Sequence, residues 1–110
     1  MDSDSEYRQQ LVTLMRSALH AWEVTTQKSK IELAEESNIW AVSIDDGRLR
    51  TRTFDRYLRL EQLPKVPRWR EVVRTAYFVL SIPTIETETR LGLEHELEKT
   101  KALLKKAAID

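Results

Sequence analysis

Residues 40–53 read WAVSIDDGRLRTRT, and this stretch decides how the rest of the chain is interpreted. Before Asp46-Gly47, apolar side chains alternate with small or acidic ones. After it, Leu49 and two threonines alternate with arginines. Alternation on both sides of an Asp-Gly pair is typical of two antiparallel strands joined by a two-residue turn. The stretch therefore predicts a β-hairpin over about residues 40–53.

Both strands of this hairpin agree on one register. Pairing across the turn puts Ile44 opposite Leu49 on an apolar face that continues through Val42–Thr51 and Trp40–Thr53. The other face then pairs Asp45 with Arg48, Ser43 with Arg50 and Ala41 with Arg52. A slip by one residue would turn the apolar set outward, so this agreement favours the hairpin. The alternative is a helix over residues 41–49, in which the central glycine alone would cost about 1 kcal/mol.

Helical patterns surround the predicted hairpin. Apolar residues at three- and four-residue spacing predict a helix over about residues 5–25, with Leu11, Leu14, Met15, Ala18, Leu19 and Trp22 on its inner face. A second helix starts at Ser29, which forms a capping box with Glu32, and ends near Asn38. A third runs from about Thr53 to before Leu63-Pro64. A fourth has Pro67 in its first turn and an apolar face of Trp69, Val72, Val73, Ala76 and Leu80.

The last predicted helix, from about residue 86 to 108, has a narrow apolar seam. Its members Leu93, Leu97, Leu104 and Ala107 follow alternating four- and three-residue steps if Thr100 takes one core position. The seam favours dimerisation with a second copy of the chain; the alternative is packing on the body of the same chain. The predicted fold is thus mainly α: a small helical bundle with one β-hairpin and a C-terminal dimerisation helix. Residues 1–82 would be the body, and 83–110 a linker with a coiled-coil-like helix.

Length and composition limit what the chain can be. It has 110 residues with no cysteine, which fits one small domain and excludes disulfides, thiolate nucleophiles and cysteine-ligated metals. No apolar run approaches the roughly 20 residues that cross a bilayer. The start of the chain, MDSDSE, is acidic where a secretory or transit peptide would be basic. We therefore expect a cytoplasmic location and no membrane partner.

The formal net charge of zero hides an uneven distribution. Residues 1–47 carry 4 basic and 9 acidic side chains, a net charge of −5. Residues 48–74 carry 9 basic and 3 acidic ones, a net charge of +6, and residues 75–110 carry 5 and 6, a net charge of −1. Neutrality of the whole chain therefore does not exclude a polyanionic partner, because the positive charge is concentrated in one block.

The basic block is nearly all arginine, whose planar guanidinium suits phosphates and guanine edges. Three of its arginines share one strand face of the predicted hairpin, and the next ones continue at helical spacing. This pattern predicts a DNA-binding surface formed by Arg48, Arg50, Thr51, Arg52, Thr53, Arg56, Arg59, Lys65, Arg68, Arg70 and Arg74. The alternative is a solvated or partner-binding face, in which Arg48 pairs with Asp45, or an arginine of the third helix pairs with Glu35 or Glu36.

The segment from Ile31 to Ile39 resembles the first helix and turn of helix-turn-helix DNA-binding proteins. Ala34 is the small residue at the helix crossing, Asn38 the turn residue, and Leu33 and Ile39 the flanking apolar residues. The resemblance covers about residues 30–49. It implies a recognition helix from Ala41 to Leu49 with Ile44 pointing inward. If this stretch is instead a wing-like hairpin, the helix from Thr53 through Arg56 and Arg59 would face the groove.

No pattern of a catalytic, metal or cofactor site is present. His20 and His95 are far apart in sequence, and Asp45-Asp46 is explained by the tight turn. Trp22 and Trp69 lie on apolar helix faces and are expected in the core, which leaves Trp40 as the candidate for stacking on a base.

The sequence thus predicts a non-enzymatic, dimeric DNA-binding protein, a bacterial-type transcriptional regulator. Its partners would be double-stranded DNA and a second copy, with no small-molecule substrate and no cofactor. The alternative is a helical adaptor whose basic face docks an acidic protein.

Overall fold

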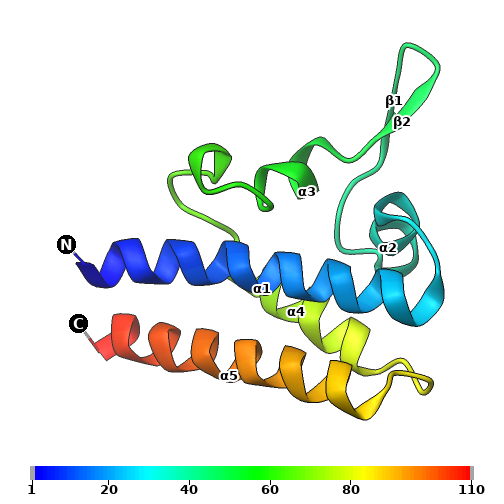
Figure 1. The fold of residues 1–110 in the computed structure, drawn as a ribbon. Helices are drawn as coiled ribbons and strands as arrows, with labels where there is room; N and C mark the ends of the chain where they lie inside the picture. Colours follow the sequence, from blue (N-terminus) through cyan, green and yellow to red (C-terminus); the bar gives the residue numbers. More distant parts are fainter. Residues whose placement is uncertain (1, 110) are drawn as a thin grey trace.

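The computed structural model describes residues 2–109, which form five α-helices, one 3-10 helix and a two-stranded antiparallel sheet. In chain order these are α1 (Asp2–Thr26), α2 (Lys30–Ser37), β1 (Ser43–Asp45), β2 (Arg48–Arg50), α3 (Arg52–Arg56), η1 (Leu60–Gln62), α4 (Trp69–Leu80) and α5 (Thr87–Ile109). Helices α1 and α5 pack antiparallel along most of their length, and α4 packs against both (Figure 1). The predicted mainly helical fold with one hairpin is confirmed.

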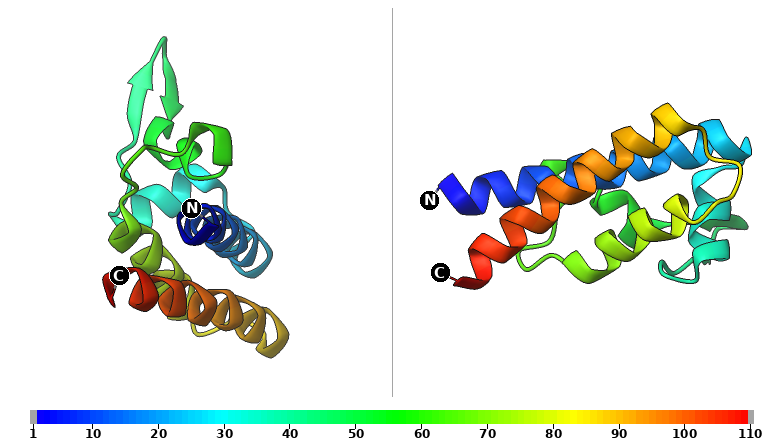
Figure 2. Two further views of the ribbon diagram at one scale, coloured as in Figure 1. Left: turned by 90° about the vertical axis from the view of Figure 1, so that its left-hand side faces the viewer. Right: turned by 90° about the horizontal axis from the view of Figure 1, so that it is seen from below.

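The elements are arranged on two sides of α1. Helices α4 and α5 lie on one side, whereas α3, η1 and the hairpin lie on the other, and the hairpin projects away from the helices (Figure 2). No helix within residues 2–109 is both long and apolar enough to cross a membrane.

The core is built around the apolar face of α1. Five of the six residues predicted for this face are buried, and Leu19 is partly buried against the same core. Full burial of a leucine contributes about 1.5–3 kcal/mol, so this face is a main source of stability. The other elements complete one continuous cluster with Leu33, Ala34, Trp40, Phe54, Tyr57, Leu63, Val72, Ala76, Val79, Ile85, Leu93 and Leu97.

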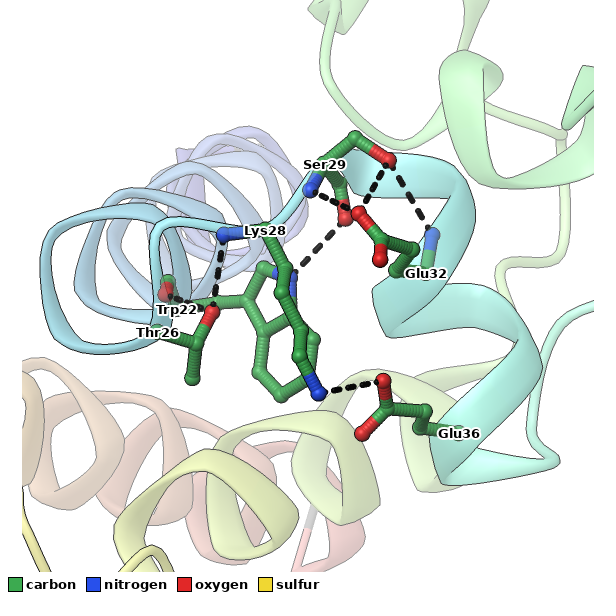
Figure 3. A network of polar contacts seen from close by, with 6 residues as sticks. All are labelled: Trp22, Thr26, Lys28, Ser29, Glu32 and Glu36. Atoms are coloured by element: carbon green, nitrogen blue, oxygen red, sulfur yellow. Dashed lines mark hydrogen bonds and ion pairs between the residues drawn. The ribbon is translucent and has the colours of Figure 1, made fainter.

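The corner between α1 and α2 is fixed by a polar network around Trp22 (Figure 3). The buried Trp22 indole donates from Nε1 to the Ser29 carbonyl oxygen at 2.9 Å. Ser29 and Glu32 form the predicted capping box, with the Ser29 backbone N–H donating to the Glu32 carboxylate at 2.9 Å. Lys28 closes the network through an ion pair with Glu36 at 2.8 Å. At the other end of α2, Asn38 adopts the expected left-handed cap, with φ 57°.

Strands β1 and β2 have the predicted register, with Ser43 paired to Arg50, Ile44 to Leu49 and Asp45 to Arg48. Both turn residues have positive φ, 55° at Asp46 and 77° at Gly47, as a type I′ turn requires. The prediction of a recognition helix over residues 41–49 is therefore wrong.

The ladder is shorter than predicted because its outer residues serve the core. Trp40 is buried and does not pair with Thr53. Its indole Nε1 donates to Thr75 Oγ1 at 2.8 Å, and its ring lies 5.0 Å from that of Tyr57. Thr51, predicted opposite Val42, is buried and donates its hydroxyl to Asp55 at 2.9 Å. Trp40 is thus a core residue, not an exposed platform for a base.

The apolar pair of the hairpin is not packed on the body of the protein. Ile44 is 75% exposed and Leu49 46% exposed. The inward position that the helix-turn-helix pattern gives Ile44 is therefore wrong, because the hairpin carries it away from the helices.

The predicted third helix is split into α3 and η1. The Leu58 carbonyl oxygen accepts a hydrogen bond from Arg16 Nε at 2.7 Å, and Arg59 has extended backbone angles, φ −136° and ψ 127°. A contact from α1 thus replaces helical hydrogen bonding at this point, which no local pattern indicates.

Helix α5 shares the core of the rest of the chain. Leu93 and Leu97 are each 2% exposed and Thr100 is fully buried. Gln10 of α1 is also buried and donates from Nε2 to the Glu96 carbonyl oxygen at 3.1 Å and to Thr100 Oγ1 at 3.3 Å. Ile85, Leu93, Leu97 and Thr100, which belong to the segment that the sequence sets apart from the body, are thus buried in the same interior.

Candidate nucleic-acid interface

The basic residues predicted to bind DNA are all exposed. Arg48 and Arg50 lie on β2, Arg52 and Arg56 on α3, Arg59 and Lys65 in the loops beside η1, Arg68 before α4, and Arg70 and Arg74 on α4. We call these nine residues the basic surface. It follows the chain from the projecting hairpin, through α3, to the first half of α4.

Few of these charges are neutralised within the chain. Within residues 2–109, Arg52 is the one member of the basic surface in an ion pair, with Asp45. The predicted alternative pairings are not formed, because Asp45 pairs with Arg52 in place of Arg48, and Glu36 pairs with Lys28. The remaining guanidinium groups are therefore open to an anionic partner.

Two side-chain contacts of the basic surface leave its charge intact. Arg56 donates from Nε to the Gln62 carbonyl oxygen at 3.3 Å. The Arg70 guanidinium lies over the Trp69 ring, 4.4 Å from its centre, in a cation–π arrangement. Trp69 is half-buried, so it is less enclosed than its apolar helix face predicts.

Two residues that are not members of the basic surface hold its middle part in place. Arg8 of α1 donates to the carbonyl oxygens of Leu63, Pro64 and Lys65 at 3.0–3.2 Å. The Tyr57 hydroxyl accepts from the Arg68 backbone N–H at 2.7 Å. These contacts fix the loop between η1 and α4 before any ligand binds. Arg8 looks like any outward-facing polar residue of a helix, so no sequence pattern could have identified this role.

A contact between α2 and α3 fixes the neighbouring part of the surface. Lys30 forms an ion pair with Asp55, and both line a shallow depression of about 340 Å³ that Arg59 also borders. The sequence did not single out Lys30. Its contact ties the predicted first helix of a helix-turn-helix to the short helix that carries Arg52 and Arg56.

The two threonines predicted at the site are less exposed than the arginines. Thr51 is 3% exposed with its hydroxyl bonded to Asp55, so it is not part of the accessible surface. Thr53 is half-buried. Thr51 is the N-cap residue of α3 and is the single residue between β2 and α3.

The four residues predicted for dimerisation fall into two groups. Leu93 and Leu97 are buried against the chain's own core, whereas Leu104 is half-buried and Ala107 exposed. The first half of α5 thus packs on the body of the same chain, which is the alternative to dimerisation that the sequence left open. Dimerisation through its second half stays a prediction.

A second concave region lies between α1 and α5. It is an open groove of about 640 Å³ bordered by side chains of both signs, including Arg16, His20, Glu88 and Glu96. Within the described part of the chain, no group of three or more histidine or acidic side chains is arranged to hold a metal ion.

No protein-family model matches the sequence, and a search of curated proteins finds no match. Among solved structures, the crystal structure of the DNA-binding domain from the sensor histidine kinase ChiS from Vibrio cholerae is similar in both sequence and fold. It is 38% identical, with a TM-score of 0.88, over 94% of this chain and 97% of that chain. The chain belongs to the family of the ChiS DNA-binding domain. The match to the ChiS domain extends over nearly the whole fold.

Proposed function

We propose that this protein is a DNA-binding domain of a bacterial-type transcriptional regulator, acting in the cytoplasm on double-stranded DNA. The observation that carries the proposal is the basic surface: nine exposed basic side chains on consecutive elements, only one of them ion-paired within residues 2–109. Its relative, the DNA-binding domain of ChiS, supports DNA as the ligand.

The proposed mechanism separates positioning from sequence recognition. Arginines at both ends of the basic surface would contact phosphates and so fix the orientation of the domain. Other side chains of the hairpin and of α3 would reach base edges. The contacts from Arg8 and Tyr57 support this role, because a loop that is already ordered loses less entropy on binding.

The test is a triple variant, Arg50→Ala, Arg52→Ala and Arg56→Ala, compared with the unaltered protein in a mobility-shift titration at several salt concentrations. Affinity should fall, and the slope of log affinity against log salt should flatten by about 0.9 for each lost phosphate contact. The matched control removes three exposed lysines from α5, Lys99, Lys105 and Lys106, and should leave the salt slope unchanged.

Two results would contradict the proposal. Full affinity with an unchanged salt slope in the arginine variant would remove the basic surface as the binding site. No complex with any duplex at low salt, from protein shown to be folded, would favour the adaptor alternative, in which the same surface docks an acidic protein.

The proposed dimer contact lies in the second half of α5, where Leu104 is half-buried and Ala107 is exposed. A two-fold dimer would bind two half-sites, spaced by the distance between the two domains. Light scattering of the free protein and of its DNA complex tests this proposal. A single copy in both states, over the whole accessible concentration range, would remove it.

A further inference from the structure

The projecting hairpin has an apolar pair, Ile44 and Leu49, that stays accessible to solvent within residues 2–109. Ile44 and Leu49 are directly opposite each other in the ladder, and they are 75% and 46% exposed. Cross-strand apolar pairs normally stabilise a sheet by packing on a core. Here the pair lies on an arm that extends away from the helices (Figures 1 and 2), so within residues 2–109 much of its apolar surface stays in contact with solvent.

The opposite face of the same arm is cationic. Side chains alternate between the two faces of a strand, so Arg48 and Arg50 point away from the face that carries Ile44 and Leu49. Neither arginine is ion-paired within the described residues, and Asp45, which lies directly opposite Arg48 in the ladder, pairs with Arg52. The arm therefore offers an apolar face and an unpaired cationic face to one ligand.

We propose that the hairpin enters the major groove of DNA, with Ile44 and Leu49 against thymine 5-methyl groups and Arg48 and Arg50 at the phosphates that border the groove. This inference rests on the proposed function and names the part of the DNA that the arm contacts. The major groove, about 12 Å wide, admits a two-stranded ribbon, and the thymine methyl is its apolar feature. With the apolar face toward the bases, the arginines are on the outer side, at the level of the phosphates.

The minor groove is a poorer fit for the same arm. It is only about 6 Å wide, and where it narrows further its negative potential increases. The arm has Asp46 at its tip, held there by the positive φ of the turn, and this carboxylate would meet that potential first. An acidic tip is tolerable in the major groove, where a carboxylate can accept from the cytosine amino group.

The experiment tests the contact between the Ile44 side chain of the protein and the thymine 5-methyl groups of the DNA. The probes are a duplex of alternating dA and dT and the same duplex with deoxyuridine for thymidine, which removes only the 5-methyl groups. The unaltered protein should bind the thymine duplex more tightly by about fourfold for each methyl contact. Ile44→Ala should weaken binding to the thymine duplex by a similar factor and bring the ratio of the two affinities close to one.

Val66→Ala is the matched control. Val66 is an exposed apolar residue, 85% accessible, that lies beside Lys65 of the basic surface but not on the arm. This variant should keep both the affinity and the thymine-to-uracil ratio of the unaltered protein. Both residues are outside the core, and circular dichroism checks that each variant is folded.

The outcomes separate this inference from the proposed function. Equal affinity of the unaltered protein for the two duplexes, or an unchanged ratio in Ile44→Ala, would overturn the major-groove contact while DNA binding stands. Sensitivity to 2,6-diaminopurine in place of adenine, without sensitivity to uracil, would assign the arm to the minor groove and also overturn it. No binding to any duplex would overturn the proposed function itself.

Discussion

At the scale of single residues, Trp40 shows how one side chain links the hairpin to the core. Its ring packs against Phe54 and Tyr57, with centres 5.5 and 5.0 Å away, and its N–H is bonded to Thr75 of α4. Thr75 in turn donates its hydroxyl to the Glu71 carbonyl oxygen at 2.7 Å. The base of the arm is thus anchored by a fully satisfied buried polar contact.

Thr75→Val should destabilise the protein by about 1–3 kcal/mol, because it leaves the buried Trp40 N–H without an acceptor. The measurement is the free energy of unfolding from a denaturant titration. Thr75→Ser keeps the hydroxyl and is the control, with a smaller loss expected. Equal losses in the two variants would show that the hydrogen bond contributes nothing beyond packing.

At the scale of elements, the start of α2 depends on the ionised form of Glu32. The Ser29 backbone N–H, its largest influence, lowers the pKa of the Glu32 carboxyl below its ordinary value of 4.5, and the Ser29 hydroxyl adds to this effect. The folded-state pKa is thus lower than the unfolded one. The resulting stabilisation is fully present above pH 4.5 and is lost as the pH falls through the folded-state pKa.

Glu32→Gln keeps an oxygen acceptor in the capping box but cannot ionise. The unaltered protein should be more stable than this variant at neutral pH, and the difference should shrink as the pH falls below 4.5. Chemical denaturation of both proteins at a series of pH values measures it. A difference that does not change with pH would show that the charge on Glu32 adds nothing to the cap.

Helix α5 is the element whose packing differs most from the packing that the sequence predicts. Its seam residues Leu93 and Leu97 are buried in the core that α5 shares with α1 and α4 of the same chain, so the amphipathic pattern is explained by the domain's own interior. The spacing of apolar residues shows that a helix has an apolar face. The spacing is the same whether that face packs against its own chain or against a second copy.

Leu93→Ala should therefore lower the free energy of unfolding by about 2–5 kcal/mol, as expected for a leucine that is 2% exposed. Leu91→Ala, on the same helix but 58% exposed, should change it by less than about 0.5 kcal/mol. Thermal or chemical unfolding distinguishes the two. Similar small effects would mean that Leu93 is not part of the domain's core in solution.

At the scale of the whole molecule, residues 83–110 contribute Ile85, Leu93 and Leu97 to the one continuous core. Their removal would strip Ile85, Leu93 and Leu97 from the cluster and expose the α5-facing side of α1. A fragment of residues 1–82 should therefore lose cooperative unfolding and much of its helical circular dichroism. A fragment that unfolds in one sharp transition would contradict this prediction.

The charge distribution also belongs to the whole molecule. The net charge of zero combines a basic surface of exposed arginines with an acidic first part, some of whose carboxylates are engaged locally, as in the Lys28–Glu36 pair. Ligand binding through charge is then confined to one part of the molecule, and the acidic remainder disfavours indiscriminate attachment to a polyanion.

The sequence by itself determined the local structure of this protein. The hairpin register, the turn at Asp46-Gly47, the capping box at Ser29 and the left-handed cap at Asn38 all follow from residues within a few positions of one another. Such features depend on local backbone preferences and side-chain alternation, which a sequence states directly. The exposed arginines of the basic surface were identified in the same way.

Only the tertiary structure decided which faces meet. It turned Trp40 and Thr51 into the core, carried Ile44 outward on the arm, placed Arg16 on the Leu58 carbonyl oxygen and packed α5 on α1. Each of these contacts joins segments far apart along the chain or follows from where such contacts place an element. No local pattern carries this information, because an apolar face or an unpaired carbonyl group is satisfied equally well by any partner that the fold brings to it.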